Sequence, residues 1–365
     1  HSARQIRFDS AEATLILSNG GSADNGIAYL GYGSGDHSNR ALVTGSGSWW
    51  HNGSTFYIGR YGMKNELFIS GGGKVTNDSN IYMGYYSDST GNLAVVEGSD
   101  SFWYQPNSSE FHLGVNGGVN RLVISNGGYV NNNQIYVGYN SHENSVLVDG
   151  PGTVWKSRST TAFVVGNGTS TSNKVTLTNG GLVDAYILTV SSGNAVEMGG
   201  GTLKVGAGGI TVSGTGIGGG GVLRNLSGTS VVNGNITLAA DSRFGSDLGD
   251  LICSNVISGS YSLTKVGPGT MILRGVNSYS GSGGIGTVVS NGALVVDGAG
   301  RINHLGTNLT LGNDNAGASL LITNGGAVSN ATAYIGYKAA STGNTATVAG
   351  SNSLWVVTNQ LYVGY

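Results

Sequence analysis

The chain has 365 residues, of which 66 are glycine and only 10% are charged, against about 25% charged residues in an ordinary globular domain. Its 39% of hydrophobic residues excludes a disordered chain, which combines low hydrophobicity with high net charge. A net charge of −2 without a basic cluster argues against a nucleic-acid partner. No apolar run reaches the about 18 residues of a membrane span.

A seven-residue phrase recurs along the chain: Asn, any residue, apolar, any, apolar, any, then Gly or Asn. The period-two alternation predicts one strand per copy with one buried face, so that Leu122 and Ile124, for example, point inward. Two further copies start at Ala13 and Ala318. The asparagine copies start at Asn39, Asn65, Asn92, Asn120, Asn144, Asn173, Asn194 and Asn344.

Two more short strands are expected in each repeat. One is the phrase apolar, aromatic, apolar, Gly, which ends at Gly31, Gly59, Gly84, Gly138, Gly336 and Gly364. The other carries an apolar residue ten positions after the asparagine, such as Trp49 or Val75. Because one such turn cannot bury its own apolar face, stacked turns are expected to share a continuous core.

The sequence therefore predicts an all-β parallel β-helix (β-solenoid) with about 26 residues and three short strands per turn. The recurring asparagines are expected to adopt left-handed geometry at a corner, with amides hydrogen-bonded along the stack. Tryptophans in alternate turns make the repeat a double turn of about 53 residues. Separate β-sandwiches are the alternative fold.

Four segments are predicted. Residues 1–12 form a lead segment, and 13–198 carry the double-turn repeats. Residues 199–311 form a Gly-rich section, and the repeats resume over 312–365, ending within a turn. Neither end has a recognisable cap, which predicts either a piece of a longer protein or turns that stack end to end.

The Gly-rich section contains the segment from Val256 to Leu273, with Leu-Thr-Lys-Val-Gly-Pro-Gly-Thr at 263–270, followed by Asn277, Tyr279 and the run Asn-Gly-Ala-Leu-Val-Val at 291–296. This pattern resembles the passenger-associated repeat of bacterial autotransporters. The resemblance implies a right-handed β-helical passenger domain that is exported across an outer membrane. It also implies a location outside the cell or on the cell surface.

No catalytic, cofactor or metal site is expected. The densest acidic group is Asp241, Asp247 and Asp250 with Arg243 nearby, interpreted as a solvated turn; a metal or catalytic cluster is the alternative. The histidines include no pair at metal-ligand spacing.

Two rows of aromatic rings are predicted to point outward. The first contains Tyr57, Tyr82 and Tyr136, because the residues on either side of each take the inward register. The second contains Trp50, Trp103, Trp155 and Trp355, each preceded by an apolar residue taken as inward. Such rings either stack on one another to stabilise the turns, or bind glycans or a second molecule.

The sequence favours a structural and adhesive extracellular shaft without catalytic activity. Its expected partner is a glycan or the surface of a host or neighbouring cell. The alternatives are a polysaccharide-degrading β-helix enzyme and a subunit of a self-assembling extracellular filament.

Overall fold

The computed structural model describes residues 4–313 and 315–364. The chain divides into two compact units, His1–Thr189 (unit 1) and Val190–Tyr365 (unit 2). In each unit the short strands pair in parallel with the corresponding strands of the next turn, which confirms the predicted all-β parallel β-solenoid. One short 3₁₀ helix, Ile217–Gly219, interrupts the strands.

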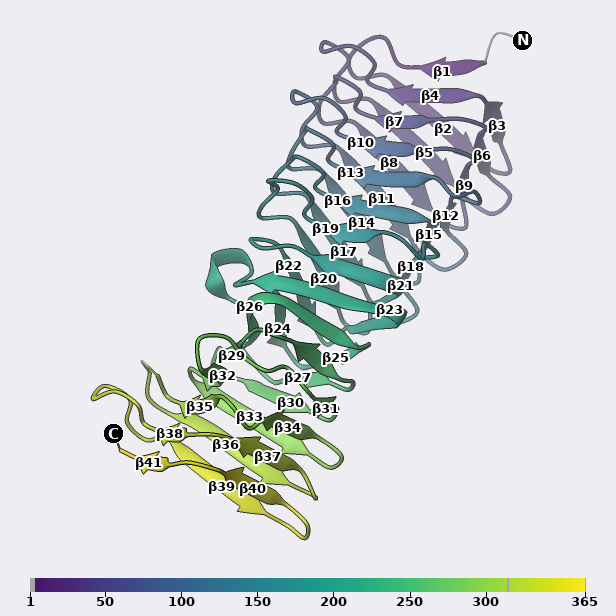
Figure 1. Ribbon diagram of the computed structural model, residues 1–365. Helices are drawn as coiled ribbons and strands as arrows, with labels where there is room; N and C mark the ends of the chain where they lie inside the picture. Colours follow the sequence, from purple (N-terminus) through teal and green to yellow (C-terminus); the bar gives the residue numbers. More distant parts are fainter. Residues whose placement is uncertain (1–3, 314, 365) are drawn as a thin grey trace. The chain divides into compact units, whose positions relative to one another are not determined.

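Unit 1 consists of three rows of strands, and each turn adds one strand to each row (Figure 1). The first row is β2 (Thr14–Ser18), β5 (Arg40–Thr44), β8 (Glu66–Ser70), β11 (Leu93–Glu97), β14 (Arg121–Ser125), β17 (Ser145–Asp149) and β20 (Lys174–Thr178). The second row is β3 (Ser22–Asn25), β6 (Trp49–Asn52), β9 (Lys74–Asn77), β12 (Phe102–Tyr104), β15 (Tyr129–Asn132), β18 (Val154–Ser157) and the start of β21 (Leu182–Val190). The third row is β1 (Gln5–Arg7), β4 (Ile27–Leu30), β7 (Phe56–Ile58), β10 (Ile81–Met83), β13 (Glu110–Leu113), β16 (Gln134–Val137) and β19 (Phe163–Val165).

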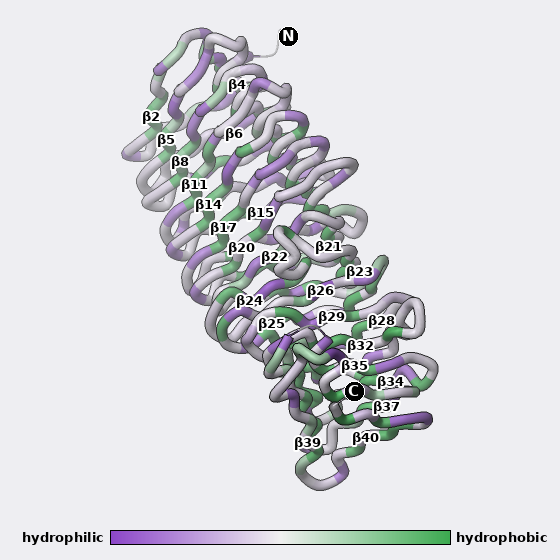
Figure 2. The backbone as a smooth tube through the Cα atoms, turned by 90° about the vertical axis from the view of Figure 1, so that its left-hand side faces the viewer, coloured by the Kyte–Doolittle hydropathy of each residue, from purple (hydrophilic) through white to green (hydrophobic). Residues whose placement is uncertain are grey.

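The core of unit 1 lies inside these three rows. Figure 2 follows the first row from β2 to β20, each strand beside the next. As predicted, the third and fifth residues of the recurring phrase point inward, and Leu122 and Ile124 are fully buried. Burial of each such side chain stabilises the fold by about 1.5–3 kcal/mol.

The recurring asparagines form a buried ladder along one corner of unit 1. From Asn65 onward, the side-chain carbonyl of each accepts hydrogen bonds from the backbone N–H and the amide nitrogen of the asparagine one turn earlier, at 2.8–3.2 Å. The carbonyl of Asn39 accepts from the backbone N–H of Ala13 at 2.9 Å. The run includes Asn39, Asn65, Asn92, Asn120, Asn144 and Asn173, all fully buried. The predicted bonding along the stack is confirmed.

The prediction of left-handed asparagines is wrong. The positive φ angles belong to the residue before each asparagine, for example Ser38 (56°), Lys64 (55°) and Glu143 (61°). The asparagine itself lies immediately before the strand, with its side chain buried inside the corner.

Unit 2 contains the remaining strands. These are β22 (Ala195–Gly199), β23 (Thr202–Gly214), β24 (Leu223–Ser227), β25 (Thr229–Asn233), β26 (Ile236–Ser246), β27 (Asp250–Cys253), β28 (Ile257–Gly259), β29 (Leu263–Val266), β30 (Thr270–Leu273), β31 (Val276–Asn277), β32 (Ile285–Val289), β33 (Gly292–Asp297), β34 (Arg301–His304), β35 (Asn308–Leu311), β36 (Ala318–Thr323), β37 (Ala327–Asn330), β38 (Ala333–Ile335), β39 (Thr345–Ala349), β40 (Leu354–Val357) and β41 (Leu361–Val363).

The turns of unit 2 change length along the chain. In the Gly-rich section, Asp250 of one turn aligns with Thr270 of the next. Near the end of the chain the turns are longer again, and Ser319 aligns with Thr345. The Gly-rich section therefore has narrower turns than unit 1, as its small residues suggest.

Polar side chains are buried in these narrower turns, among them Lys265 and a set formed by Tyr279, Thr287 and His304. Lys265 is fully buried, and its Nζ donates to the backbone carbonyls of Gly267, Gly269 and, at 2.9 Å, Asn291. Burial lowers the pKa of Lys265 to about 8. In the same section of the chain, the hydroxyl of Thr287 lies 2.7 Å from the Tyr279 hydroxyl and 2.9 Å from Nε2 of His304.

Candidate binding surface

Turns of two lengths alternate between the first and second strand rows of unit 1. Four residues separate the strands at 45–48, 98–101 and 150–153, but only three separate them at 71–73, 126–128 and 179–181. Because side chains alternate along a strand, one extra residue in the turn exchanges the inward and outward faces of the strand that follows.

This extra residue makes the prediction for the tryptophans wrong. Trp50, Trp103 and Trp155 follow the four-residue turns and point inward, with no exposed surface. Trp50 and Trp103 both align with Val75 of the turn between them. Trp355 occupies the equivalent place in unit 2, where it aligns with Val328 and is partly buried.

The buried tryptophans form an aromatic column with phenylalanines of the third row. Ring centroids lie 5.1 Å apart between Trp50 and Phe56, 6.2 Å between Phe56 and Trp103, and 5.6 Å between Trp103 and Phe111. The indole N–H of Trp50 donates to Asn25 at 2.7 Å. The double turn therefore alternates large and small core layers.

The tyrosines point outward as predicted. Tyr57, Tyr82 and Tyr136 are partly exposed, while the residues flanking each are buried. Their rings continue a stack in which Tyr57 lies 5.0 Å from Tyr29 and 5.3 Å from Tyr82. His112 occupies the tyrosine position one turn later, 5.3 Å from Tyr82 and 4.7 Å from Tyr136. Burial in this stack raises the pKa of Tyr57 to about 12.

These contacts cover much of the ring faces in the tyrosine row. A face that already packs on a neighbouring ring is not available to a ligand, although the ring edges remain accessible. The row therefore stabilises the stacking of turns more directly than it offers a binding platform.

The residue before each buried tryptophan is turned outward instead. Trp49 is 38% exposed, and Phe102 is partly exposed one double turn later. Lys74 comes from the turn between them, with its ammonium 5.9 Å from the centre of the Phe102 ring. The second strand row thus presents aromatic rings beside a cation on its outer face.

A hollow of about 620 Å³ opens beside these residues. The short turn 71–73 and the longer turns 45–48 and 98–101 on either side of it in the sequence all contribute to its lining. We call this hollow the niche. Its lining is Ser46, Gly71, Gly72, Lys74, Ser99, Asp100, Phe102 and Tyr129.

Gly71 lines the niche without a side chain. The equivalent position in other turns carries asparagine at the same left-handed φ of 51–53°, as in Asn126, Asn179 and Asn324. Those side chains donate across to the acid that ends the neighbouring strand, namely Glu97, Asp149 and Asp297, respectively. Gly71 has a similar φ of 56°, and a Cβ built there would lie 3.4 Å from Oγ1 of Thr44 and from the backbone nitrogen of Gly45, in the turn before it.

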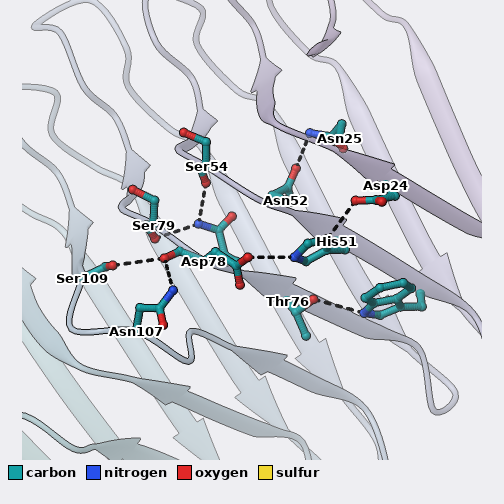
Figure 3. Close-up of polar contacts among 12 residues, drawn as sticks. Asp24, Asn25, His51, Asn52, Ser54, Thr76, Asp78, Ser79, Asn107 and Ser109 are labelled. Atoms are coloured by element: carbon teal, nitrogen blue, oxygen red, sulfur yellow. Dashed lines mark hydrogen bonds and ion pairs between the residues drawn. The ribbon is translucent and has the colours of Figure 1, made fainter. Parts of the chain in front are cut away.

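A polar cluster of Asp24, His51 and Asp78 lies on the outer face of the second strand row, farther along the strands than the niche. His51 bridges two turns, with Nδ1 2.8 Å from Asp24 and Nε2 3.1 Å from Asp78 (Figure 3). Burial alone would lower the pKa of His51, but the bonds to both carboxylates outweigh it and raise that pKa. Trp49 stacks on the imidazole at 5.3 Å. The cluster braces three successive turns.

The predicted acidic group in unit 2 does not converge. Asp247 pairs with Arg224 at 2.6 Å, whereas Asp241 accepts hydrogen bonds from Ser282 at 2.6 Å and from the backbone of Ser262 at 2.8 Å. Among residues 4–313 and 315–364, no three His, Cys, Asp or Glu side chains gather where they could hold a metal ion. The described part of the chain also contains no helix long and apolar enough to cross a membrane.

Sequence reasoning missed the residues of the niche. The available signal was the glycine at position 71, where related turns have asparagine. It would have drawn attention to this turn, although not to the outward register of Phe102.

One comparison with known proteins gives a match. Residues 263–296 match the passenger-associated-transport-repeat family, and they run from β29 to β33. No curated protein and no solved structure matches the chain significantly. The match includes Lys265, whose Nζ is held by carbonyls of the Gly-Pro-Gly turn and of the next turn.

Proposed function

We propose that this chain is a non-catalytic adhesive shaft. The proposal starts from its transport repeat and its parallel β-solenoid, which fit an autotransporter passenger domain. The repeat implies secretion to the cell surface or exterior. There the niche of unit 1 binds a sugar residue of a glycan carried by a host or neighbouring cell.

The niche is the observation that supports this proposal. Sugar-binding sites combine an aromatic ring, against which the C–H face of a pyranose packs, with polar groups that bind its hydroxyls. Phe102 and Tyr129 supply rings, and Lys74 and Asp100 supply a donor and an acceptor on either side. A volume of about 620 Å³ is of the size of small-molecule sites.

The opposite charges favour a neutral sugar. An acidic sugar would gain from Lys74 but would be repelled by the exposed carboxylate of Asp100, whereas hydroxyl groups bind both. A long neutral glycan could then extend along the outer face of the second strand row toward Trp49.

A side chain added at a lining position of the niche gives the first test. Gly71→Asn introduces the residue that the related turns already carry at this left-handed position, so the fold should be kept. Binding of the whole chain to a glycan array should fall at least tenfold, while the thermal melt should move by no more than a few degrees. Phe102→Ser and Lys74→Ala should weaken the same signals.

Asn126→Gly is the matched control, because it removes a side chain from the equivalent short turn without touching the niche. It should leave glycan binding unchanged. Persistent binding by Gly71→Asn and Phe102→Ser would contradict the assignment of the niche. A parent chain that binds no glycan on the array would contradict the proposed function itself.

A further inference from the structure

Two tyrosines of unit 1 form a pair closer than those of the tyrosine row. Tyr61 follows β7, and Tyr86 follows β10 in the next turn. Their ring centroids lie 4.0 Å apart with an interplanar angle of 11°, against 5.0 Å for Tyr29 and Tyr57. The backbone N–H of Tyr86 donates to the carbonyl of Arg60 at 3.1 Å, which keeps the two loops in register.

The hydroxyl groups of this pair lie at the same end of the stack. A hydrogen bond to the side chain of Tyr86 raises the pKa of Tyr61. Since the hydroxyls are neighbours, the ring carbons next to them are neighbours as well. The guanidinium of Arg60 lies 5.2 Å from the ring centre of Tyr61 and 5.7 Å from that of Tyr86, so it packs against both rings. Both tyrosines are partly exposed to solvent.

We propose that Tyr61 and Tyr86 are a site of oxidative modification, at which a peroxide-driven one-electron oxidant joins them as dityrosine. Each phenol loses one electron and one proton to give a tyrosyl radical. The radicals couple through the ring carbons next to the oxygens, and each ring then moves its displaced hydrogen back to oxygen. The two electrons and two protons reduce one peroxide to two waters.

Such a link would tie two turns together in a chain that lacks another covalent tie. Cys253 is the only cysteine, and it is buried, so the chain cannot form an internal disulfide. The link would close the loop of chain between positions 61 and 86, and loop closure of this kind restricts the unfolded chain. This inference does not depend on glycan binding.

The sequence allows a direct assay. The folded chain is treated with peroxidase and hydrogen peroxide, then digested with trypsin. Cleavage after Arg60 and Lys64 isolates Tyr61 in the short peptide 61–64, while Tyr86 lies in peptide 75–121. We expect the two peptides to be recovered as one species that lacks two hydrogen atoms, together with dityrosine fluorescence.

Tyr61→Phe should remove this species and most of the early fluorescence. Tyr29→Phe alters the pair of Tyr29 and Tyr57, whose ring centroids lie 5.0 Å apart. It should leave both the linked peptides and the dityrosine fluorescence unchanged. The chain must remain monomeric by size-exclusion chromatography, because the link is internal. Dityrosine formed mainly between chains or at other tyrosines, or an unchanged yield in Tyr61→Phe, would overturn the proposal.

Discussion

In unit 1 the same hydrogen-bonding arrangement is repeated at one corner of successive turns. The narrow turns of unit 2 instead contain different buried hydrogen-bonding arrangements, each of which occurs once. In unit 1 the asparagine ladder passes from turn to turn, beside a core column of tryptophan and phenylalanine. In unit 2 the narrower turns contain Lys265 among backbone carbonyls and the set of Tyr279, Thr287 and His304.

The difference shows what a parallel solenoid requires. A repeated ladder needs turns that place the same residue at the same corner, which the recurring phrase of unit 1 does. A hydrogen-bonding arrangement that occurs once satisfies only the buried polar groups next to it, so it does not require turns of constant length. Turns can therefore be shorter in unit 2, as between Asp250 and Thr270. Four substitutions test this contrast, from the largest expected effect to the smallest.

Trp103→Ala should damage unit 1 most. It removes a fully buried indole between Phe56 and Phe111, and a cavity of this kind costs about 3–5 kcal/mol. Urea unfolding followed by circular dichroism would measure the loss. Phe102→Ala is the control, since its outward side chain should cost about 1 kcal/mol or less; equal losses would contradict the inward register.

Lys265 should make the free energy of unfolding of unit 2 increase at alkaline pH. Its folded pKa of about 8 lies below the about 10.4 of an unfolded lysine. Between these values the unfolded chain binds more protons, so the free energy of unfolding should rise with pH, by about 3 kcal/mol at most. Below about pH 8 both states are protonated, and this contribution to the pH dependence disappears.

Lys265→Met should remove that alkaline rise, while the parent chain keeps it. Denaturant unfolding at several pH values, with the variant subtracted from the parent, isolates the lysine from other groups that titrate above pH 9. An identical pH profile in both proteins would show that the ammonium is as well stabilised by its carbonyl partners as it is by water.

Asn120→Ala should open the ladder at one turn. It leaves the backbone N–H of Asn92 without its acceptor, at a cost of about 1–3 kcal/mol, while the amide of Asn92 keeps its bond to Ser89. Amide hydrogen exchange should increase most in the turns on either side. Asn116→Ala, which changes an exposed asparagine, should be nearly neutral.

Val119→Gly should stabilise unit 1 slightly. Val119 has a φ of 61°, an unfavourable conformation for a β-branched residue, and its side chain is 56% exposed. Relief of strain should exceed the entropic cost of glycine, for a gain of about 1 kcal/mol. The reverse change Gly91→Val, at the same corner one turn earlier, should lower the melting temperature instead.

Several features follow from the sequence because they depend on local pattern alone. Alternation within each copy of the phrase is enough to place Leu122 and Ile124 inward. Recurrence of the asparagine at the first position of each copy is enough to predict bonds between successive turns, as between Asn92 and Asn120. The transport repeat is visible in its own residues, around Lys265 and Gly267.

The tertiary structure alone decided which of two adjacent aromatic residues enters the core. Trp49 and Trp50 are both apolar, so the local pattern allows either register; the four-residue turn before them, aligned against the three-residue turn of the next repeat, selects Trp50. That choice turns Trp49 and Phe102 outward and, with Gly71, creates the niche. The carbonyl partners of Lys265 also come partly from a residue of the next turn, Asn291, which only the stacking of turns brings near. Register between turns is a long-range property, and it depends on how many residues each corner uses.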